Sequence, residues 1–315
     1  MPLNSKEISI RAPHRISGFF QIVDEINGQK IQNPEKIGSR GAGLTLTGYG
    51  YTKVSINESE INEFEINING CKQNDSASTT YYICNYLKEK FKNTVNLTIN
   101  HNFDLPVGCG FGASGSGALG AALGIGYLMD LNITYNEAAR IAHIAEVENK
   151  TGLGTVAGLW FGGLSIVLEP GYPFHVDKIF YPPDLKVICG TFGELKTKSV
   201  LSNPVLSAKI KNAGKRAMEN ILMSPNIFTF MDESVNFVEN IDILNLLNLT
   251  ECRELINSLN KVKKVKASMN QLGKSVFSIC FPEESNLVLE IFESYKPEIQ
   301  IYKLEICPSG PIIMK

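Results

Sequence analysis

The stretch LPVGCGFGASGSGALGAALG, residues 105–124, holds seven glycines, two serines and no charged side chain. Glycine leaves backbone N–H groups open to a ligand, and the N-terminus of a following helix carries partial positive charge. Both features suit a phosphate group. The alternative is close packing of a buried helix against a sheet, but packing alone does not require glycines before the first turn. The glycines that matter most for phosphate are Gly108, Gly110, Gly112 and Gly115.

Two common phosphate-binding motifs fail in this context. GFGASG at 110–115 matches the dinucleotide pattern G-x-G-x-x-G, with Asp130 at about the expected distance. Residues 117–129, however, read as one helix, which leaves no second strand to present Asp130 to a ribose. No Gly-Lys-[Ser/Thr] follows the glycines, so a Walker A loop is also excluded. What remains is a glycine loop with two hydroxyls, Ser114 and Ser116, that can contact phosphate or magnesium.

The composition is that of a folded protein of ordinary charge. The chain has 315 residues, 43% hydrophobic and 20% charged, with a formal charge of −2. This length favours two domains, and the charge gives no reason to expect nucleic acid or a membrane surface as partner. The seven cysteines contain no C-x-x-C pair, and the N-terminal stretch has no apolar segment. We therefore expect a cytoplasmic protein without disulfides, a zinc site or a membrane span.

Strand and helix patterns alternate along the whole chain. Strand-like alternation at 7–12, 51–56, 63–68 and 94–101 surrounds a helical stretch at 78–93. A further helix is expected to begin after Thr134, with Thr134 as its N-cap. Between 169 and 174 the sequence EPGYPF indicates a break, after which a new strand begins. The prediction is α+β in both halves, with domains at 1–178 and 179–315.

At this point the sequence resembles the galactokinase, homoserine kinase, mevalonate kinase and phosphomevalonate kinase (GHMP) family of small-molecule kinases. The phosphate loop of that family reads P-x-G-x-G-[LF]-G-x-S, and a first motif near the N-terminus reads A-P-x-[KRH]. The N-terminal motif is matched by APHR, with Arg15 at the cation position. The phosphate-loop motif is matched by Pro106, Gly108, Gly110, Phe111, Gly112 and Ser114. Within the family the chain is most similar to archaeal pantoate kinases, through blocks such as GSRGAG (38–43), HIAEVENKTGLG (143–154) and MNQLGKSVF (269–277).

The resemblance implies a two-domain GHMP kinase fold: an N-terminal α/β nucleotide-binding domain and a C-terminal ferredoxin-like α+β domain. It implies ATP and Mg²⁺ as cofactors. Glu146 and Ser114, or Ser116 in its place, would hold the magnesium ion, and Arg15 would neutralise charge on the transferring phosphoryl group. ATP would contact the phosphate loop from Pro106 to Ser116, including Gly115.

The resemblance also places a small hydroxy acid as the phosphoryl acceptor. The residues implied to contact it are Ser39, Arg40, His143, Thr155 and Thr197. Taken singly, three of the residues carried over have plainer alternatives: a solvated helix charge for Glu146, a core histidine with its hydrogen bonds satisfied for His143, and a turn hydroxyl for Thr197.

Three departures from the family bear on the acceptor. Thr155 stands where most members carry a presumed catalytic Asp, and Arg15 replaces the histidine usual in pantoate kinases. At the end of the strand after GG, where those kinases tend to carry an arginine, the sequence reads Val167-Leu168-Glu169. Fewer acids and an added Arg40 would suit an acceptor that already bears a phosphate.

We therefore predict mevalonate 3-phosphate, phosphorylated at its terminal primary hydroxyl, over pantoate. A catalytically silent ATP-binding regulator is the alternative from another class. Whether the chain forms a homodimer stays open.

Overall fold

The computed structural model describes residues 7–58, 61, 63–74, 76–91, 94–195 and 204–314. Its largest element is an eight-stranded sheet in the order β14-β1-β4-β7-β5-β6, with β8 pairing β4 and β9 pairing β8. All neighbouring strands run antiparallel except β5 and β7. The strands are β1 Glu7–Val23, β4 Gly38–Glu58, β5 Glu63–Ile68, β6 Cys71–Lys72, β7 Val95–Phe103, β8 Leu164–Val167, β9 Val176–Lys178 and β14 Ile312–Met314.

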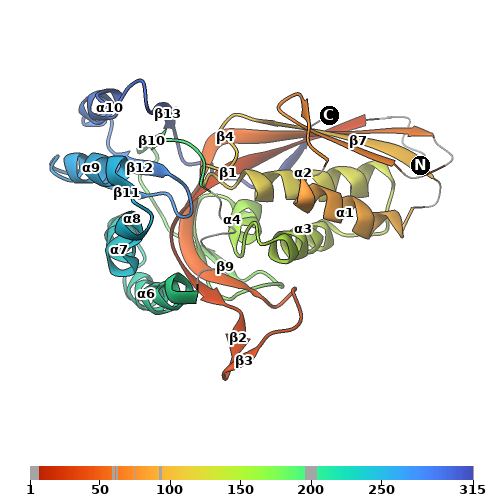
Figure 1. Cartoon of the computed structure of the whole chain (residues 1–315), viewed down its shortest axis with the longest axis horizontal. Helices are drawn as coiled ribbons and strands as arrows, with labels where there is room; N and C mark the ends of the chain where they lie inside the picture. Colours follow the sequence, from red (N-terminus) through yellow and green to blue (C-terminus); the bar gives the residue numbers. More distant parts are fainter. Residues whose placement is uncertain are drawn as a thin grey trace.

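Four helices cover one face of this sheet (Figure 1). They are α1 Ser78–Lys88, α2 Ala113–Leu128, α3 Tyr135–Asn149 and α4 Thr155–Phe161. Helix α2 is buried on nearly all sides because its glycines and alanines let it approach the sheet closely. A Cβ at Gly120 would lie 2.1 Å from Thr52 Oγ1. The glycines after the first turn of α2 therefore serve packing, while those before it are left for another task. Thr134 caps α3 by accepting a hydrogen bond from Glu137 N at 3.1 Å, as predicted.

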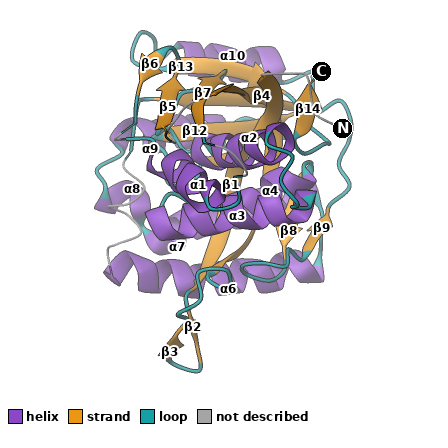
Figure 2. Cartoon of the chain, turned by 90° about the vertical axis from the view of Figure 1, so that its right-hand side faces the viewer, coloured by secondary structure: helices purple, strands orange, loops and turns teal. Residues whose placement is uncertain are grey.

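Strands β1 and β4 are far longer than the sequence pattern indicated. They pair over most of their length, with irregularities at Pro13/His14 and Ser17/Phe19. Their far ends leave the four-helix layer and pack against α6 (Pro204–Met223) and α7 (Ile227–Ile241) in the C-terminal half. Beyond them the short hairpin of β2 (Glu25–Ile26) and β3 (Gln29–Lys30) projects from the body (Figures 1 and 2).

The second sheet has the order β11-β12-β10-β13 and is fully antiparallel. Its chain order is one strand, a group of helices, two strands, a helix and a last strand, which is the ferredoxin-like arrangement. The predicted two-domain GHMP kinase fold is thereby confirmed. The strands are β10 Lys186–Thr191, β11 Lys266–Met269, β12 Ser275–Cys280 and β13 Gln300–Leu304, and the remaining helices are α8 Ile243–Leu246, α9 Thr250–Leu259 and α10 Ser285–Glu293.

The predicted boundary at 178/179 falls between β9 and β10, which belong to different sheets. The end of the chain nevertheless returns to the first sheet, where Ile10 pairs with Ile313. The division into 1–178 and 179–315 therefore stays a prediction. No helix within the described ranges is both long enough and apolar enough to cross a membrane.

Candidate active site

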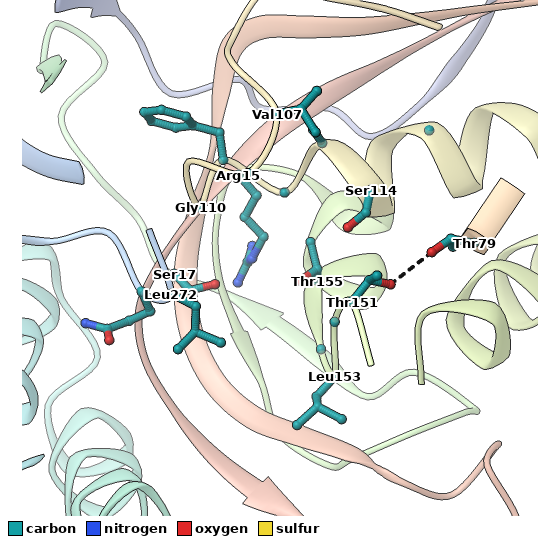
Figure 3. A pocket seen from close by; sticks show the side chains of 18 of the residues that line it. Arg15, Ser17, Thr79, Val107, Gly110, Ser114, Thr151, Leu153, Thr155 and Leu272 are labelled. Atoms are coloured by element: carbon teal, nitrogen blue, oxygen red, sulfur yellow. Dashed lines mark hydrogen bonds between the residues drawn. The ribbon is translucent and has the colours of Figure 1, made fainter. Parts of the chain in front are cut away.

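A cavity of about 600 Å³ lies where the phosphate loop meets the C-terminal half (Figure 3). On one side it is lined by the start of α1 and by β7, including Thr79, Thr80, His101 and Phe103. On the other side lie residues of β1, β4 and the β11–β12 turn. We call this second part the acceptor end, and its lining comprises Arg15, Ser17, Phe19, Phe20, Ser39, Gly41, Ala42, Leu153, Gly154, Thr155, Val167, Gln271 and Leu272. Ser114 lies between the two parts, as Figure 3 shows.

The glycine loop between β7 and α2 forms the floor of the cavity. Gly110 and Gly112 have φ angles of 86° and 69°, which a residue with a Cβ rarely adopts. Phe111 lies between them and is fixed to β1, because its carbonyl accepts a hydrogen bond from Arg15 N at 3.0 Å. Gly112 is the N-cap of α2, so the positive end of that helix faces the cavity. The loop therefore has the geometry of an anion cradle.

The structure divides the predicted ATP-binding residues into two groups. Gly108, Gly110, Phe111, Gly112 and Ser114 line the cavity. Pro106, Gly115 and Ser116 are not among the lining residues; Gly115 already belongs to α2, and Ser116 is fully buried with its hydroxyl donating to Ala12 O at 3.2 Å. Of the two candidate metal-ligating serines, the structure therefore favours Ser114.

Arg15 is a buried cation without a carboxylate partner in the described ranges. It is 3% exposed, and its Nη1 donates to Ser165 Oγ at 2.9 Å. Burial lowers its pKa to about 10, so the guanidinium remains charged at neutral pH. The side chain fits in a slot between Gly43 and Gly158, where a Cβ on either glycine would clash with it. An unpaired buried guanidinium that lines a cavity is an anion site.

Glu146 lies directly behind the cavity wall. It is 1% exposed, and its Oε1 accepts a hydrogen bond of 2.6 Å from Thr151 Oγ1. Its Oε2 is buried without a hydrogen-bond partner and faces Gly152 and Gly115. Burial raises the pKa of this carboxyl to about 7, while the nearby hydroxyls of Thr151 and Ser114 oppose the shift. A lone buried carboxylate oxygen beside a serine hydroxyl fits the few hard ligands that Mg²⁺ accepts from protein.

The structure brings only part of the predicted acceptor set into the cavity. Ser39 and Thr155 line it, and Thr155 Cγ2 also packs against the glycine loop. Arg40 is absent from the lining, because neighbouring residues on β4 point to opposite faces and its Nε donates to Leu168 O at 2.7 Å. Thr197 lies outside the described residues.

His143 is likewise absent from the lining. It is 2% exposed, its Nε2 bonds to Ile37 O at 3.0 Å, and its ring meets Phe174 edge-on. Burial lowers its pKa to about 4, so it is neutral. These contacts fit a buried core histidine that is hydrogen-bonded to the backbone better than a residue that contacts the substrate. The pair Arg40 and His143 is therefore not part of the cavity as predicted.

Sequence reasoning missed two groups of lining residues. The β11–β12 turn contributes Gln271 and Leu272 from the C-terminal half. Across the cavity, His101 bonds through its two ring nitrogens to Thr52 and Thr80 hydroxyls, both at 2.9 Å, and stacks on Phe103. The only sequence signal for the turn was its place in the block MNQLGKSVF, which gave no role to either residue.

A glycine-rich anion cradle, a buried arginine without a carboxylate partner and a buried glutamate beside a serine are the groups that a phosphoryl-transfer site requires. The model of the N-terminal domain of GHMP kinases matches residues 78–163. A pantoate kinase from Thermococcus kodakarensis is 34% identical over 278 residues, which is 87% of either chain. One from Methanocaldococcus jannaschii is 32% identical over 233 residues, covering 74% of this chain and 80% of the relative. The chain belongs to the GHMP kinase family and is an ATP-dependent small-molecule kinase.

Solved structures agree with this assignment. A phosphotransferase related to the CoA biosynthesis pathway superimposes with a TM-score of 0.86 at 30% identity, and covers 98% of both chains. Mevalonate 3-kinase from Thermoplasma acidophilum, with mevalonate 3-phosphate and ADP bound, gives a TM-score of 0.68 at 15% identity, covering 100% of this chain and 99% of that one. At that identity the second likeness shows the fold alone.

Proposed function

We propose that the protein transfers the γ-phosphoryl group of ATP to the terminal hydroxyl of pantoate. The observation that carries this proposal is the charge of the acceptor end. Arg15 is the one buried charged side chain among the described residues that line the cavity; the other two charged lining residues, Lys150 and Glu194, are exposed. The wall around Arg15 is largely apolar. Pantoate brings a single negative charge on a compact branched carbon skeleton, which suits an apolar wall with few charged groups. The pantoate kinases similar to this chain support the same acceptor.

The sequence favoured mevalonate 3-phosphate on the premise that Arg40 would hold its phosphate. That premise fails, because Arg40 bonds to the Leu168 carbonyl and does not line the cavity. A phosphate beside a carboxylate brings between two and three negative charges, and Arg15, the one buried cation among the described lining residues, cannot neutralise them. Mevalonate 3-phosphate is retained as the second candidate on one observation: Thr155 adds no negative charge near the acceptor.

The residues of the chain have separate tasks in this reaction. The glycine loop and the N-terminus of α2 bind and orient the phosphates, and Arg15 stabilises negative charge at the transferred group. Glu146 and Ser114 would hold Mg²⁺, which when bound neutralises charge on the phosphate oxygens. Thr155 cannot act as a strong base, so positioning and charge neutralisation supply most of the catalysis, as a loose transition state allows.

A side-by-side assay tests the acceptor. Purified protein with ATP and Mg²⁺ should be offered pantoate, mevalonate 3-phosphate and mevalonate at equal concentrations, with ADP release and phosphorylated product both measured. We expect the highest kcat/KM with pantoate. Faster turnover of mevalonate 3-phosphate would replace the proposal by the second candidate.

A further inference from the structure

The turn that joins β11 to β12, residues 270–273, extends from the C-terminal half into the acceptor end. Leu272 at its tip has a φ of 64°, the left-handed conformation, and lines the cavity. For a residue other than glycine, asparagine or aspartate this conformation costs about 1–2 kcal/mol. Figure 3 shows Leu272 beside Ser17, with Leu153 lower in the view, below Thr151 and Thr155. The fold thus holds an apolar side chain in an unfavourable backbone conformation at the acceptor.

Gln271, the preceding residue, has an unused hydrogen-bond acceptor. The side chain is 5% exposed, and its Nε2 donates to Gly18 O at 3.1 Å and to Met269 O at 3.2 Å. These two carbonyls fix the amide orientation, since Oε1 could not bond to them. Oε1 is buried without a partner, although the residue lines the cavity. A buried acceptor of this kind costs free energy until a donor reaches it.

The turn is also fixed relative to the phosphate loop. Ser275 Oγ donates to Cys109 O at 2.7 Å, and Gln271 N donates to Ser17 O at 3.1 Å. Gly273 lies so close to the loop that a Cβ on it would be 2.1 Å from Cys109 O. A ligand held by the turn is therefore held at a set position relative to the transferred phosphoryl group.

We propose that this turn selects the acceptor by two contacts, a proposal that rests on the function proposed above. Leu272 covers the branched apolar carbon of the acceptor, and Gln271 Oε1 accepts a hydrogen bond from the hydroxyl that is not phosphorylated. Pantoate offers both groups, since it has a dimethyl carbon and a second hydroxyl. Mevalonate 3-phosphate has no second free hydroxyl.

The variant Leu272→Asn tests the apolar contact. Asparagine has nearly the size of leucine and is tolerated in the left-handed region, so the backbone strain is relieved while the apolar surface is lost. We expect KM for pantoate to rise by about tenfold or more, with KM for ATP changed less than about threefold and Tm unchanged or higher. Lys264→Asn is the matched control, because exposed Lys264 has the same φ of 64° and does not line the cavity. It should leave KM for pantoate unchanged.

Two pantoate analogues separate the contacts. 2,4-Dihydroxybutanoate lacks the methyl groups, and 4-hydroxy-3,3-dimethylbutanoate lacks the second hydroxyl. Wild type should use both with kcat/KM about tenfold or more below that for pantoate, because a site built around a hydroxyl discriminates against its absence. Leu272→Asn should lose the discrimination against the first analogue and keep that against the second.

The outcomes separate the two proposals. Turnover of pantoate by wild type, with no change of KM in Leu272→Asn and with both analogues used as well as pantoate, would overturn the role of the turn and leave the proposed function standing. Preference of wild type for mevalonate 3-phosphate over pantoate would overturn both.

Discussion

The Gly158→Ala variant should disable the enzyme by displacing Arg15. A Cβ at position 158 would lie 2.1 Å from Arg15 Cζ, 2.2 Å from Nη1 and 2.5 Å from Nε, whereas ordinary contacts begin at 3.4 Å. The guanidinium must therefore move by more than about 1 Å, and a misplacement of this size can lower a rate by about 100-fold. The move also breaks the 2.9 Å bond to Ser165, and a hydrogen bond to a charged group contributes about 1.5–3 kcal/mol.

The assay is steady-state turnover with ATP, Mg²⁺ and pantoate. We expect kcat to fall by about 100-fold, with ATP binding by calorimetry weakened much less, because the glycine loop is untouched. Gly126→Ala is the matched control. That residue also lies in a helix, its new Cβ would meet only the end of the flexible Ile133 side chain, and it does not line the cavity. Retention of kcat within threefold of wild type in a folded Gly158→Ala protein would refute the idea that catalysis depends on the position of Arg15.

Three further predictions follow from the site. Burial raises the pKa of Glu146 in the folded protein to about 7 from an ordinary 4.5, so without ligand its contribution to stability is complete below pH 4.5 and is lost as the pH rises to about 7. Glu146→Gln should abolish this pH-dependent part of the Tm profile. The same variant should also abolish the rise of Mg²⁺-dependent ATP affinity with pH. Arg40→Ala should change KM for pantoate less than about threefold, and an increase of tenfold would return Arg40 to the site. His143→Phe removes a buried hydrogen bond, so the free energy of unfolding should fall by about 1–3 kcal/mol and Tm with it, while KM values stay unchanged; a rise in KM at unchanged Tm would show that the histidine contacts substrate.

The backbone geometry of the glycine loop could be predicted from the sequence, because glycine spacing before a helix depends on local backbone geometry alone; the role of the loop in binding phosphate stays a prediction. Gly110 and Gly112 need the left-handed region whatever surrounds them, and the Thr134 cap is equally local. The ferredoxin-like half also followed from the family resemblance, and the order of its strands confirms it.

The acceptor end was less predictable, because it depends on the direction of side chains and on contacts between distant segments. Neighbours on a strand point to opposite faces, so Ser39 lines the cavity while Arg40 does not. Gly43 and Gly158 are more than a hundred residues apart in the sequence, and no sequence pattern indicated that both would flank Arg15. The contribution of Leu272 required a turn from the other half of the chain to reach the phosphate loop.

The continuous pair β1 and β4 has a consequence for how the molecule unfolds and moves. Both strands belong to the sheet under α1–α4, and their far ends also pack against helices of the C-terminal half, β1 against α6 and α7 and β4 against α6, so the two halves share packing that neither keeps alone. The two halves should lose amide protection in a single cooperative step in hydrogen exchange rather than as separate modules. A pair of long strands shared in this way resists wide hinge opening between the two halves.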